Sequence, residues 1–189
     1  KNFPEEFRTK ETADLFLALI IKILKKNGRA AVVLPDGSLF GEGVKTKIKE
    51  ELLSKCNLHT IVRLPNGVFN PYTGIKTNLL FFEKGKATKE TWYYEMPYPE
   101  GIKNYSASRP IDIKHFDEIK KWWFDRKENE YAWKVLFKEI KTRNFNLDIK
   151  NGNTSEEEIA QSAEELISIL ENSFKKSIAL LAEIKKDQK

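Results

Sequence analysis

The sequence predicts an α/β fold that forms the second half of a doubly wound sheet and ends in an antiparallel hairpin. Three short apolar runs, rich in branched and aromatic residues, have the length of buried strands. A helical pattern precedes the first run and another separates the first run from the second, whereas no helix fits between the second and the third. Because parallel neighbours need a crossover connection, we expect the second and third strands to be antiparallel. The three runs are Arg29–Leu34, His59–Leu64 and Asn78–Lys84.

The first predicted helix precedes these strands and covers residues 11–27. Apolar residues occupy most of its circumference, which is typical of a well-buried helix. After the first strand we expect a loop over Pro35–Gly43, because Pro-Asp-Gly and the glycines that follow it favour turns. A second helix is expected over residues 44–54, so helices and strands alternate as far as the second strand.

The chain beyond the third strand contains more loop. A fourth strand is expected over Thr91–Glu95, and the prolines and glycine within residues 97–115 are typical of a loop. A helix is expected over residues 114–124. Its neighbouring Trp122 and Trp123 point about 100° apart, so at most one of them faces fully inward. A combination of core packing and an interface is therefore favoured over a platform for nucleic-acid bases.

The chain is expected to have two parts, a domain over residues 1–152 and a long amphipathic helix over residues 153–189. Asn151-Gly152-Asn153 breaks the earlier pattern, and Ser155 and Glu158 after it form a capping-box signature. Apolar residues then recur at spacings of three and four, which predicts a seam along one helix face. A partner helix or the chain's own domain would cover this seam. The seam residues are Ile159, Ala163, Leu166, Leu170, Phe174, Ile178 and Leu181.

Charge is distributed unevenly along the chain. The net charge of +5 combines −3 over residues 154–189 with +8 over the remaining residues. A basic globular part suits an anionic partner such as nucleic acid. On charge alone, ordinary solvated lysines explain the excess equally well.

Two further features bear on where the protein works. The sequence has no run of 18 or more apolar residues, so we expect no membrane-spanning helix. Cys56 is the single cysteine, which excludes an internal disulfide and favours a reducing, cytoplasmic setting. The chain starts at Lys1 without Met and without a signal peptide, so we expect it to be part of a longer protein.

Residues 65–77, between the second and third strands, are the leading candidate for a functional site. A loop of this length without regular structure is uncommon unless it has a function. Its Phe69 and Tyr72 suit stacking on a nucleic-acid base, and Lys76 and Thr77 suit contact with phosphate. From the residues alone, packing of Phe69 into the core beneath the loop is the favoured interpretation.

Pro35, Asp36 and Gly37 directly follow the first strand, and the carboxyl end of a strand is a common position for a functional acid. Pro-Asp-Gly is also ordinary turn chemistry, which is the favoured interpretation. The sequence shows no glycine-rich phosphate loop, no zinc-type spacing and no Ser-His-Asp or Cys-His arrangement. We therefore expect no catalytic residue and no metal site, and we assign structural roles to His59 and His115.

Four stretches in combination resemble a known family: GRAAVVLPDGSLFGEG, LPNGVFNPYTGIKTNLLFFEKG, TWYYE and NFNLDIKN. They are similar to the modification (M) subunit of type I restriction–modification systems, over roughly residues 10–152. That family consists of N6-adenine DNA methyltransferases that use S-adenosylmethionine. The resemblance implies the C-terminal half of a Rossmann-like S-adenosylmethionine-dependent methyltransferase sheet with an antiparallel terminal hairpin, plus a long C-terminal helix.

The resemblance also implies what the chain lacks. The family's catalytic Asn-Pro-Pro-Phe/Tyr motif and its glycine-containing cofactor motif lie upstream of the part that this chain resembles. Neither is present, and Asn70-Pro71-Tyr72 lacks the second proline and follows the wrong strand. We therefore expect the chain alone to be inactive and to lack the main S-adenosylmethionine site.

A role for the loop between the second and third strands is implied as well. In related adenine methyltransferases an aromatic residue just after the sixth strand stacks on the adenine that is flipped out of the duplex. Phe69 matches that position, and Tyr72 is the second choice. The segment with Pro35, Asp36 and Gly37 would flank the same pocket.

The partners implied by the resemblance are DNA, a specificity subunit, a second modification subunit and, as a further candidate, a restriction subunit, with no membrane partner. The seam expected within residues 153–189 suits docking on the specificity subunit. A function of another class is the alternative, namely a non-catalytic assembly or DNA-binding module built on the half-fold.

Overall fold

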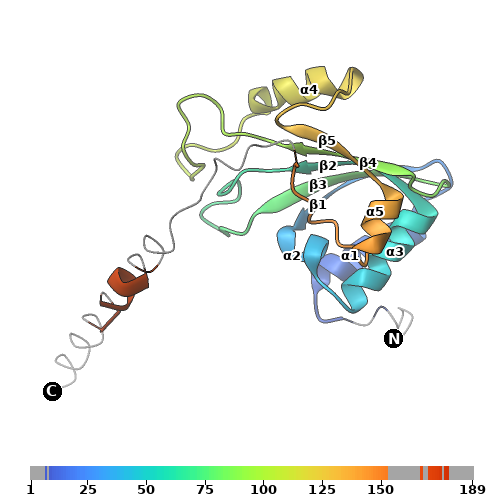
Figure 1. Ribbon diagram of the computed structural model, residues 1–189, viewed down its shortest axis with the longest axis horizontal. Helices are drawn as coiled ribbons and strands as arrows, with labels where there is room; N and C mark the ends of the chain where they lie inside the picture. The colour runs from blue at the N-terminus through green and yellow to red at the C-terminus, as the bar shows by residue number, and fades with distance from the viewer. Residues whose placement is uncertain (1–6, 8, 153–166, 168–169, 176, 179–189) are drawn as a thin grey trace. The chain divides into compact units, whose positions relative to one another are not determined.

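The computed structural model describes residues 7, 9–152, 167, 170–175 and 177–178. The chain divides into two units, residues 1–153 and residues 154–189, and each is described by itself. The first unit contains a five-stranded mixed sheet in the order β1-β3-β2-β4-β5 (Figure 1).

β3 (Thr77–Lys84) lies between β1 (Arg29–Pro35) and β2 (Cys56–Arg63) and runs antiparallel to both. β4 (Glu90–Glu95) is parallel to β2, and β5 (Ala132–Leu136) is antiparallel to β4. The expected antiparallel pairing of the second and third strands is confirmed. β3 also separates the first two strands, which the order along the chain does not reveal.

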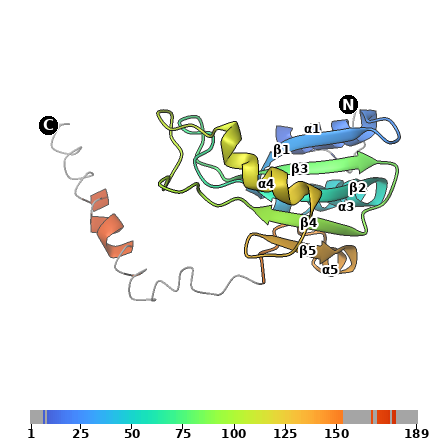
Figure 2. The same ribbon diagram turned by 90° about the horizontal axis from the view of Figure 1, so that it is seen from above.

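Helices cover both faces of the sheet (Figures 1 and 2). One face carries α1 (Thr12–Ile23), α2 (Asp36–Phe40), α3 (Val44–Lys55) and α5 (Phe137–Thr142). The other face carries α4 (Asp117–Phe124), which follows the 3₁₀ helix η2 (Ile113–Phe116). The strands therefore supply two cores.

Neighbouring strand residues face different cores. Ile61 and Tyr93 pack in the larger core beneath α1, α3 and α5, whereas Val62 and Tyr94 pack in the smaller core beneath α4. This is the alternation that a pleated strand imposes. Burial on both sides explains why the strands appear in the sequence as nearly continuous apolar runs.

α1 is shorter and less buried than the sequence predicts. It ends at Ile23 rather than at residue 27, and Asn27 turns the chain with a φ of 63°. Phe16 and Ile23 are 63% and 67% exposed, because only one side of α1 packs on the unit. The adjacent β1 is an edge strand whose Val33 is 48% exposed. This side of the first unit thus presents an apolar surface and an unpaired strand edge.

The predicted loop over Pro35–Gly43 is wrong in part, because α2 forms within it. Pro35 has the extended conformation that precedes a helix, with φ −68° and ψ 155°. The buried Lys49 of α3 supports the end of α2: its Nζ donates to the carbonyls of Leu39 at 2.6 Å and Gly41 at 2.8 Å. This support comes from another helix, so the local sequence does not show it.

The fourth strand and the helix before Asp125 are confirmed as β4 and α4. Trp122 is buried, whereas Trp123 is partly buried against the rings of Phe81 and His59. The prediction that at most one tryptophan faces fully inward is therefore confirmed. β5 and α5 lie in a stretch for which the sequence pattern predicted no definite element.

In the second unit, the described residues 167, 170–175 and 177–178 are helical. Most of the helix expected over residues 153–189 lies outside the described residues, so its length stays a prediction. No helix in the described ranges has the length and apolarity needed to cross a bilayer. Four apolar residues at spacings of three and four are exposed: Ile167, Leu170, Phe174 and Ile178.

Candidate functional site

We call residues 65–76, between β2 and β3, the aromatic loop. Two backbone hydrogen bonds fix its base: Leu64 N–H donates to the Thr77 carbonyl and Asp36 N–H donates to the Lys76 carbonyl, both at 3.0 Å. The second bond joins the loop to the start of α2. The ends of β1 and β2 and the start of β3 therefore lie together, at the kind of sheet edge where ligands bind in α/β proteins.

Tight turns shape the aromatic loop around Phe69. Gly67 has a φ of +77°, a conformation that favours glycine, and its carbonyl accepts the Asn70 N–H at 3.0 Å. The Phe69 carbonyl accepts the N–H groups of Tyr72 at 2.9 Å and Thr73 at 3.2 Å. These bonds give the loop a defined shape without help from a helix or strand.

Phe69 and Tyr72 project from this loop and are 40% and 93% exposed. Val68, rather than Phe69, packs against the core beneath the loop. The interpretation that Phe69 fills the core is therefore not what the structure shows. A ring that is 40% exposed can accept a flat partner without unpacking the core.

The two residues expected to contact phosphate have different surroundings. Lys76 Nζ forms an ion pair with Glu95 Oε1 at 3.0 Å, and both side chains are partly exposed. Thr77 is buried, and its hydroxyl has no access to a ligand in this chain. A phosphate contact by Lys76 stays a prediction, whereas the burial of Thr77 argues against its part in that contact.

Charged and amide side chains form a polar cluster behind the aromatic loop. Arg63, at the end of β2, is buried and pairs through Nη2 with Asp148 Oδ1 at 2.7 Å. The same guanidinium lies 4.0 Å from Asp36 Oδ1. The fully buried Asn78 donates from Nδ2 to that Asp36 oxygen at 2.6 Å. The polar cluster thus ties three strand ends to the segment after α5.

Three polar atoms in this region have no hydrogen-bond partner within the described part of the chain: Arg63 Nε, Thr77 Oγ1 and Asn78 Oδ1. A buried polar atom without a partner costs about 1–3 kcal/mol. Such atoms are rare in folded proteins, and these three lie at the same edge of the sheet as the aromatic loop.

A second loop, residues 97–112, lies beside the aromatic loop at the same end of the sheet (Figure 2). We call it the neighbouring loop. Tyr98 donates its hydroxyl hydrogen to the Asn66 carbonyl at 3.0 Å, and Asn70 Nδ2 donates to the Tyr105 carbonyl at 3.1 Å. The two loops therefore form one joined surface.

Both histidines have structural surroundings. His115 Nδ1 is hydrogen-bonded with the Tyr105 hydroxyl at 3.0 Å and accepts the Asp112 N–H at 3.1 Å. His59 packs edge-on against Trp123, and burial lowers the pKa of His59. No group of three or more His, Cys, Asp or Glu side chains among the described residues could hold a metal ion.

Two cavities, of about 630 and 510 Å³, lie along α4. Both are lined by Tyr94, Pro97, Glu118 and Lys121, and neither is lined by the aromatic loop or by Asp36. Phe69 and Tyr72 therefore project from the surface of this unit rather than into either cavity.

Sequence reasoning missed most of the polar cluster. The sequence pattern predicts only that Arg63 and Asn78 lie in strands, and it predicts no role for Asp148. An arginine inside the apolar run HTIVRLP was the available signal, because a buried guanidinium needs a carboxylate partner. The sequence alone could not identify Asp148 as that partner, since 85 residues separate the two.

Comparisons with known proteins identify relatives of this chain. The N-6 DNA Methylase family model matches residues 1–161. The methylase subunit of type I restriction enzyme EcoEI from Escherichia coli is 65% identical over 158 residues, covering 80% of this chain and 32% of that protein. The EcoKI methylase subunit from Escherichia coli K12 is 46% identical over 142 residues, covering 62% of this chain and 26% of that protein. The chain spans about a third or less of these relatives.

Solved structures show the same relationship. A modification subunit of a putative type I restriction enzyme from Vibrio vulnificus YJ016 matches with a TM-score of 0.76 and 48% identity, covering 81% of this chain and 34% of that chain. A structure concerned with complex assembly and conformational transition of the type I R-M system matches with a TM-score of 0.76 and 37% identity. The match covers 97% of this chain and 40% of that chain. The mixed α/β unit and its sequence agree on one conclusion: this chain belongs to the N-6 DNA methylase family.

Proposed function

We propose that this chain works as the C-terminal part of the modification subunit of a type I restriction–modification enzyme. The complete subunit would transfer a methyl group from S-adenosylmethionine to N6 of an adenine flipped out of the DNA duplex. The observation that carries the proposal is Phe69, an exposed aromatic side chain on a loop fixed at its base. Enzymes that modify a base extrude it and hold it against aromatic faces. Tyr72 is the second candidate for this stacking.

S-adenosylmethionine is the cofactor that the family implies, and the residues of this chain do not fit its main site. The polar cluster is closed by the Arg63–Asp148 ion pair, and the two large cavities lie along α4. We therefore assign the principal cofactor residues and the catalytic residue to other parts of the subunit. Pro35, Asp36 and Gly37 would border the pocket from the start of α2.

The exposed side of the first unit supports a larger Rossmann-like methyltransferase sheet, of which this unit is the C-terminal half. β1 has a free edge, and Phe16 and Ile23 of α1 stand exposed beside it. Free backbone groups of an edge strand pair readily with another strand, and exposed apolar groups favour a covering layer. The remainder of the subunit would supply both.

For residues 153–189 we propose a docking helix for the specificity subunit, within an assembly that contains a second modification subunit, binds DNA and also engages a restriction subunit. The exposed Ile167, Leu170, Phe174 and Ile178 support an apolar contact along one helix face. We place this assembly in the cytoplasm. Deletion of residues 154–189 should abolish co-purification with the specificity subunit, and retained assembly would contradict the docking role.

The decisive test of the proposed function is Phe69→Ala in the full-length subunit, assembled with its specificity subunit. Stacking on a base is worth about 1–3 kcal/mol, so methylation should fall by roughly 5- to 150-fold. A 2-aminopurine at the target adenine should lose the fluorescence increase that accompanies base flipping. DNA affinity should stay within about twofold, because other contacts hold the backbone.

Phe124→Ala provides the matched control, because Phe124 is an equally large aromatic residue that is 90% exposed at the end of α4. This variant should methylate DNA normally. If Phe69→Ala also turned over at the normal rate, Phe69 would have no role in holding the base.

The exposed seam in the second unit also favours the alternative, a non-catalytic assembly module. The two proposals differ in the reading frame upstream of Lys1. An in-frame glycine-containing motif followed by Asn-Pro-Pro-Phe or Asn-Pro-Pro-Tyr supports the enzyme. A start codon next to Lys1 would support the module.

A further inference from the structure

We propose that the neighbouring loop, residues 97–112, binds the phosphate backbone of DNA beside the extruded base, through Lys103 and Arg109. This inference rests on the proposed function, because it takes DNA as the partner of the adjacent Phe69. It adds a second contact surface, whose ligand is phosphate rather than a base.

The position of the neighbouring loop is the first argument. The hydrogen bonds from Tyr98 to Asn66 and from Asn70 to Tyr105 join it to the aromatic loop. Space between the loops is so small that a Cβ added at Gly67 would lie 2.8 Å from the Tyr105 carbonyl oxygen. A duplex that delivers a base to Phe69 must therefore pass close to the neighbouring loop.

Two exposed cations without ion pairs in the described part of the chain are the second argument. Lys103 and Arg109 are exposed, and neither forms an ion pair with any described residue. Many lysines elsewhere do pair: on α4, Lys120 contacts Asp117 at 2.8 Å and Lys121 contacts Glu118 at 2.7 Å. The cations of the neighbouring loop are thus available to an anion that is not part of the described chain.

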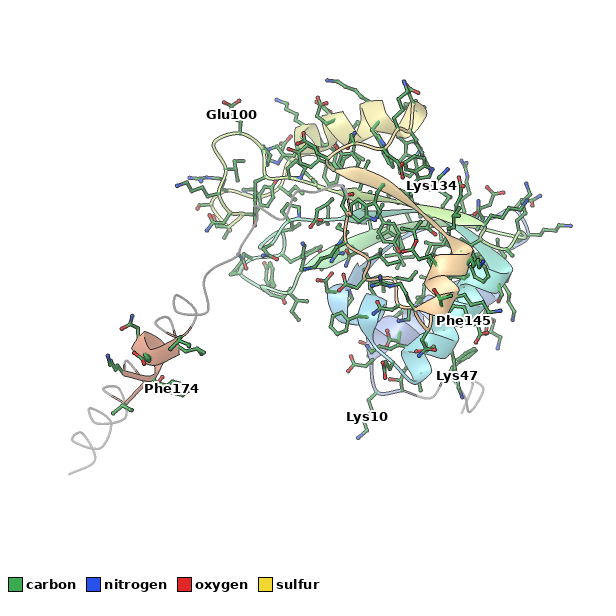
Figure 3. All side chains as sticks on the ribbon, viewed as in Figure 1. Lys10, Lys47, Glu100, Lys134, Phe145 and Phe174 are labelled. Carbon is green, nitrogen blue, oxygen red and sulfur yellow. The ribbon has the colours of Figure 1, made fainter. Side chains whose placement is uncertain are left out.

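Glu100 is an acidic residue of the same loop, and it lies at the outer turn of the loop (Figure 3). The second acid, Asp112, accepts the N–H of Lys114 and so caps η2. Neither carboxylate forms an ion pair with Lys103 or Arg109.

The shape of the loop around Arg109 is the third argument. Ser106 and Arg109 exchange two backbone hydrogen bonds, at 3.1 and 3.0 Å, which close a tight turn. The hydroxyls of Ser106 and Ser108 lie 3.1 Å apart on this turn. Arginine and serine are typical phosphate ligands, and a guanidinium can bind two phosphate oxygens at once. The buried Tyr105 anchors the turn to the domain.

The test is the double variant Lys103→Ala/Arg109→Ala in the full-length subunit assembled with its specificity subunit. DNA affinity is measured at several salt concentrations, on duplexes with and without the recognition sequence. Each lost phosphate contact should reduce the slope of log affinity against log salt by about 0.9, so the pair should reduce it by about 1.8. The loss should be similar on both duplexes, because phosphate contacts carry no sequence information.

Lys86→Ala/Lys89→Ala is the matched control. It removes the same charge from exposed residues near the β3–β4 turn, which lies at the opposite end of the sheet (Figure 2). Its salt slope should equal that of the unmodified enzyme. An equal change of slope in both double variants would show that only overall charge matters and would overturn the proposal.

Two other results decide between this inference and its rivals. An unchanged salt slope together with weaker binding of the specificity subunit would mean that the neighbouring loop contacts an acidic protein surface, which overturns the proposal. At saturating DNA, Lys103→Ala/Arg109→Ala should keep the 2-aminopurine signal, whereas Phe69→Ala should lose this signal and keep the salt slope. Failure of base stacking and failure of the phosphate contact are therefore distinguishable.

Discussion

The two ends of the sheet differ in how completely their buried polar groups are hydrogen-bonded. At the end where β3 turns into β4, the side chain of Thr88 is 3% exposed, and its hydroxyl both donates and accepts a hydrogen bond. Its hydroxyl donates to the Cys56 carbonyl at 2.8 Å and accepts the Leu58 N–H at 2.9 Å. Gly85 N–H donates to the Lys55 carbonyl at 3.1 Å, which joins the same turn to the end of α3. This end is closed by its own hydrogen bonds.

The opposite end carries the aromatic loop, and some of its buried polar atoms have no hydrogen-bond partner in the described part of the chain. Arg63 Nε and Asn78 Oδ1 are buried without partners in the described part of the chain, and Phe69 and Tyr72 of the aromatic loop are exposed. Groups that are paired internally support the fold, whereas the exposed aromatic side chains at this end are available for contact with another molecule. The comparison therefore separates the end of the sheet that its own hydrogen bonds close from the end that we propose to contact DNA.

Arg63 offers the strongest test of this comparison, because it lies at the end that carries the aromatic loop and also forms an ion pair. Arg63→Ala leaves the Asp148 carboxylate without its partner at 2.7 Å, and we expect a loss of about 3 kcal/mol in the free energy of unfolding. Urea denaturation followed by circular dichroism measures this loss. The variant Arg63→Ala/Asp148→Ala should recover part of it. A loss below about 1 kcal/mol would show that the polar cluster contributes little to stability.

Thr88→Val tests the comparison at the end of the sheet where β3 turns into β4. The substitution keeps the shape of the side chain and removes the hydroxyl, so it leaves a buried carbonyl and a buried N–H without their partner. We expect a loss of about 2 kcal/mol in the free energy of unfolding. In the assembled enzyme, methylation per folded subunit should be unchanged. Reduced turnover with normal stability would contradict the division between the two ends.

Lys49 gives the smallest expected effect, which is a change in how the free energy of unfolding depends on pH. Burial lowers its pKa to about 8, against the opposing influence of the Asp14 carboxylate. Between this value and the ordinary pKa near 10.5, the unfolded chain binds more protons than the folded chain, so stability rises with pH. From pH 7 to pH 9 we expect a gain of about 1 kcal/mol relative to Lys49→Met. Parallel pH profiles of the two proteins would contradict this.

Local patterns in the sequence located most of the elements. Apolar runs marked β1, β2, β3 and β4, and turn residues marked the long loop that carries Phe69. The insertion of β3 between β1 and β2 depends on contacts between distant segments, which no local pattern contains. α2 escaped prediction for the same reason, since Lys49 supports it from α3.

Buried charges were the least predictable part of the candidate site. Asp14 and Lys49 look like ordinary surface residues in the sequence, yet both are nearly inaccessible. Asp14 is held by Lys45 at 2.9 Å and by the Ser38 hydroxyl at 2.9 Å. Partners of this kind become visible only when the helices are packed. The burial of Thr77 was missed because a loop end and a strand start look alike in the sequence.

The free edge of β1 has a consequence for the chain in concentrated solution. Within the described part of the chain, β1 (Arg29–Pro35) has a strand partner on one side only, and Arg29 is its only charged residue. Nothing on this strand repels a second copy, so two chains that meet edge to edge would join into one continuous sheet. The first strand to reach β1 after synthesis therefore decides between native assembly and aggregation.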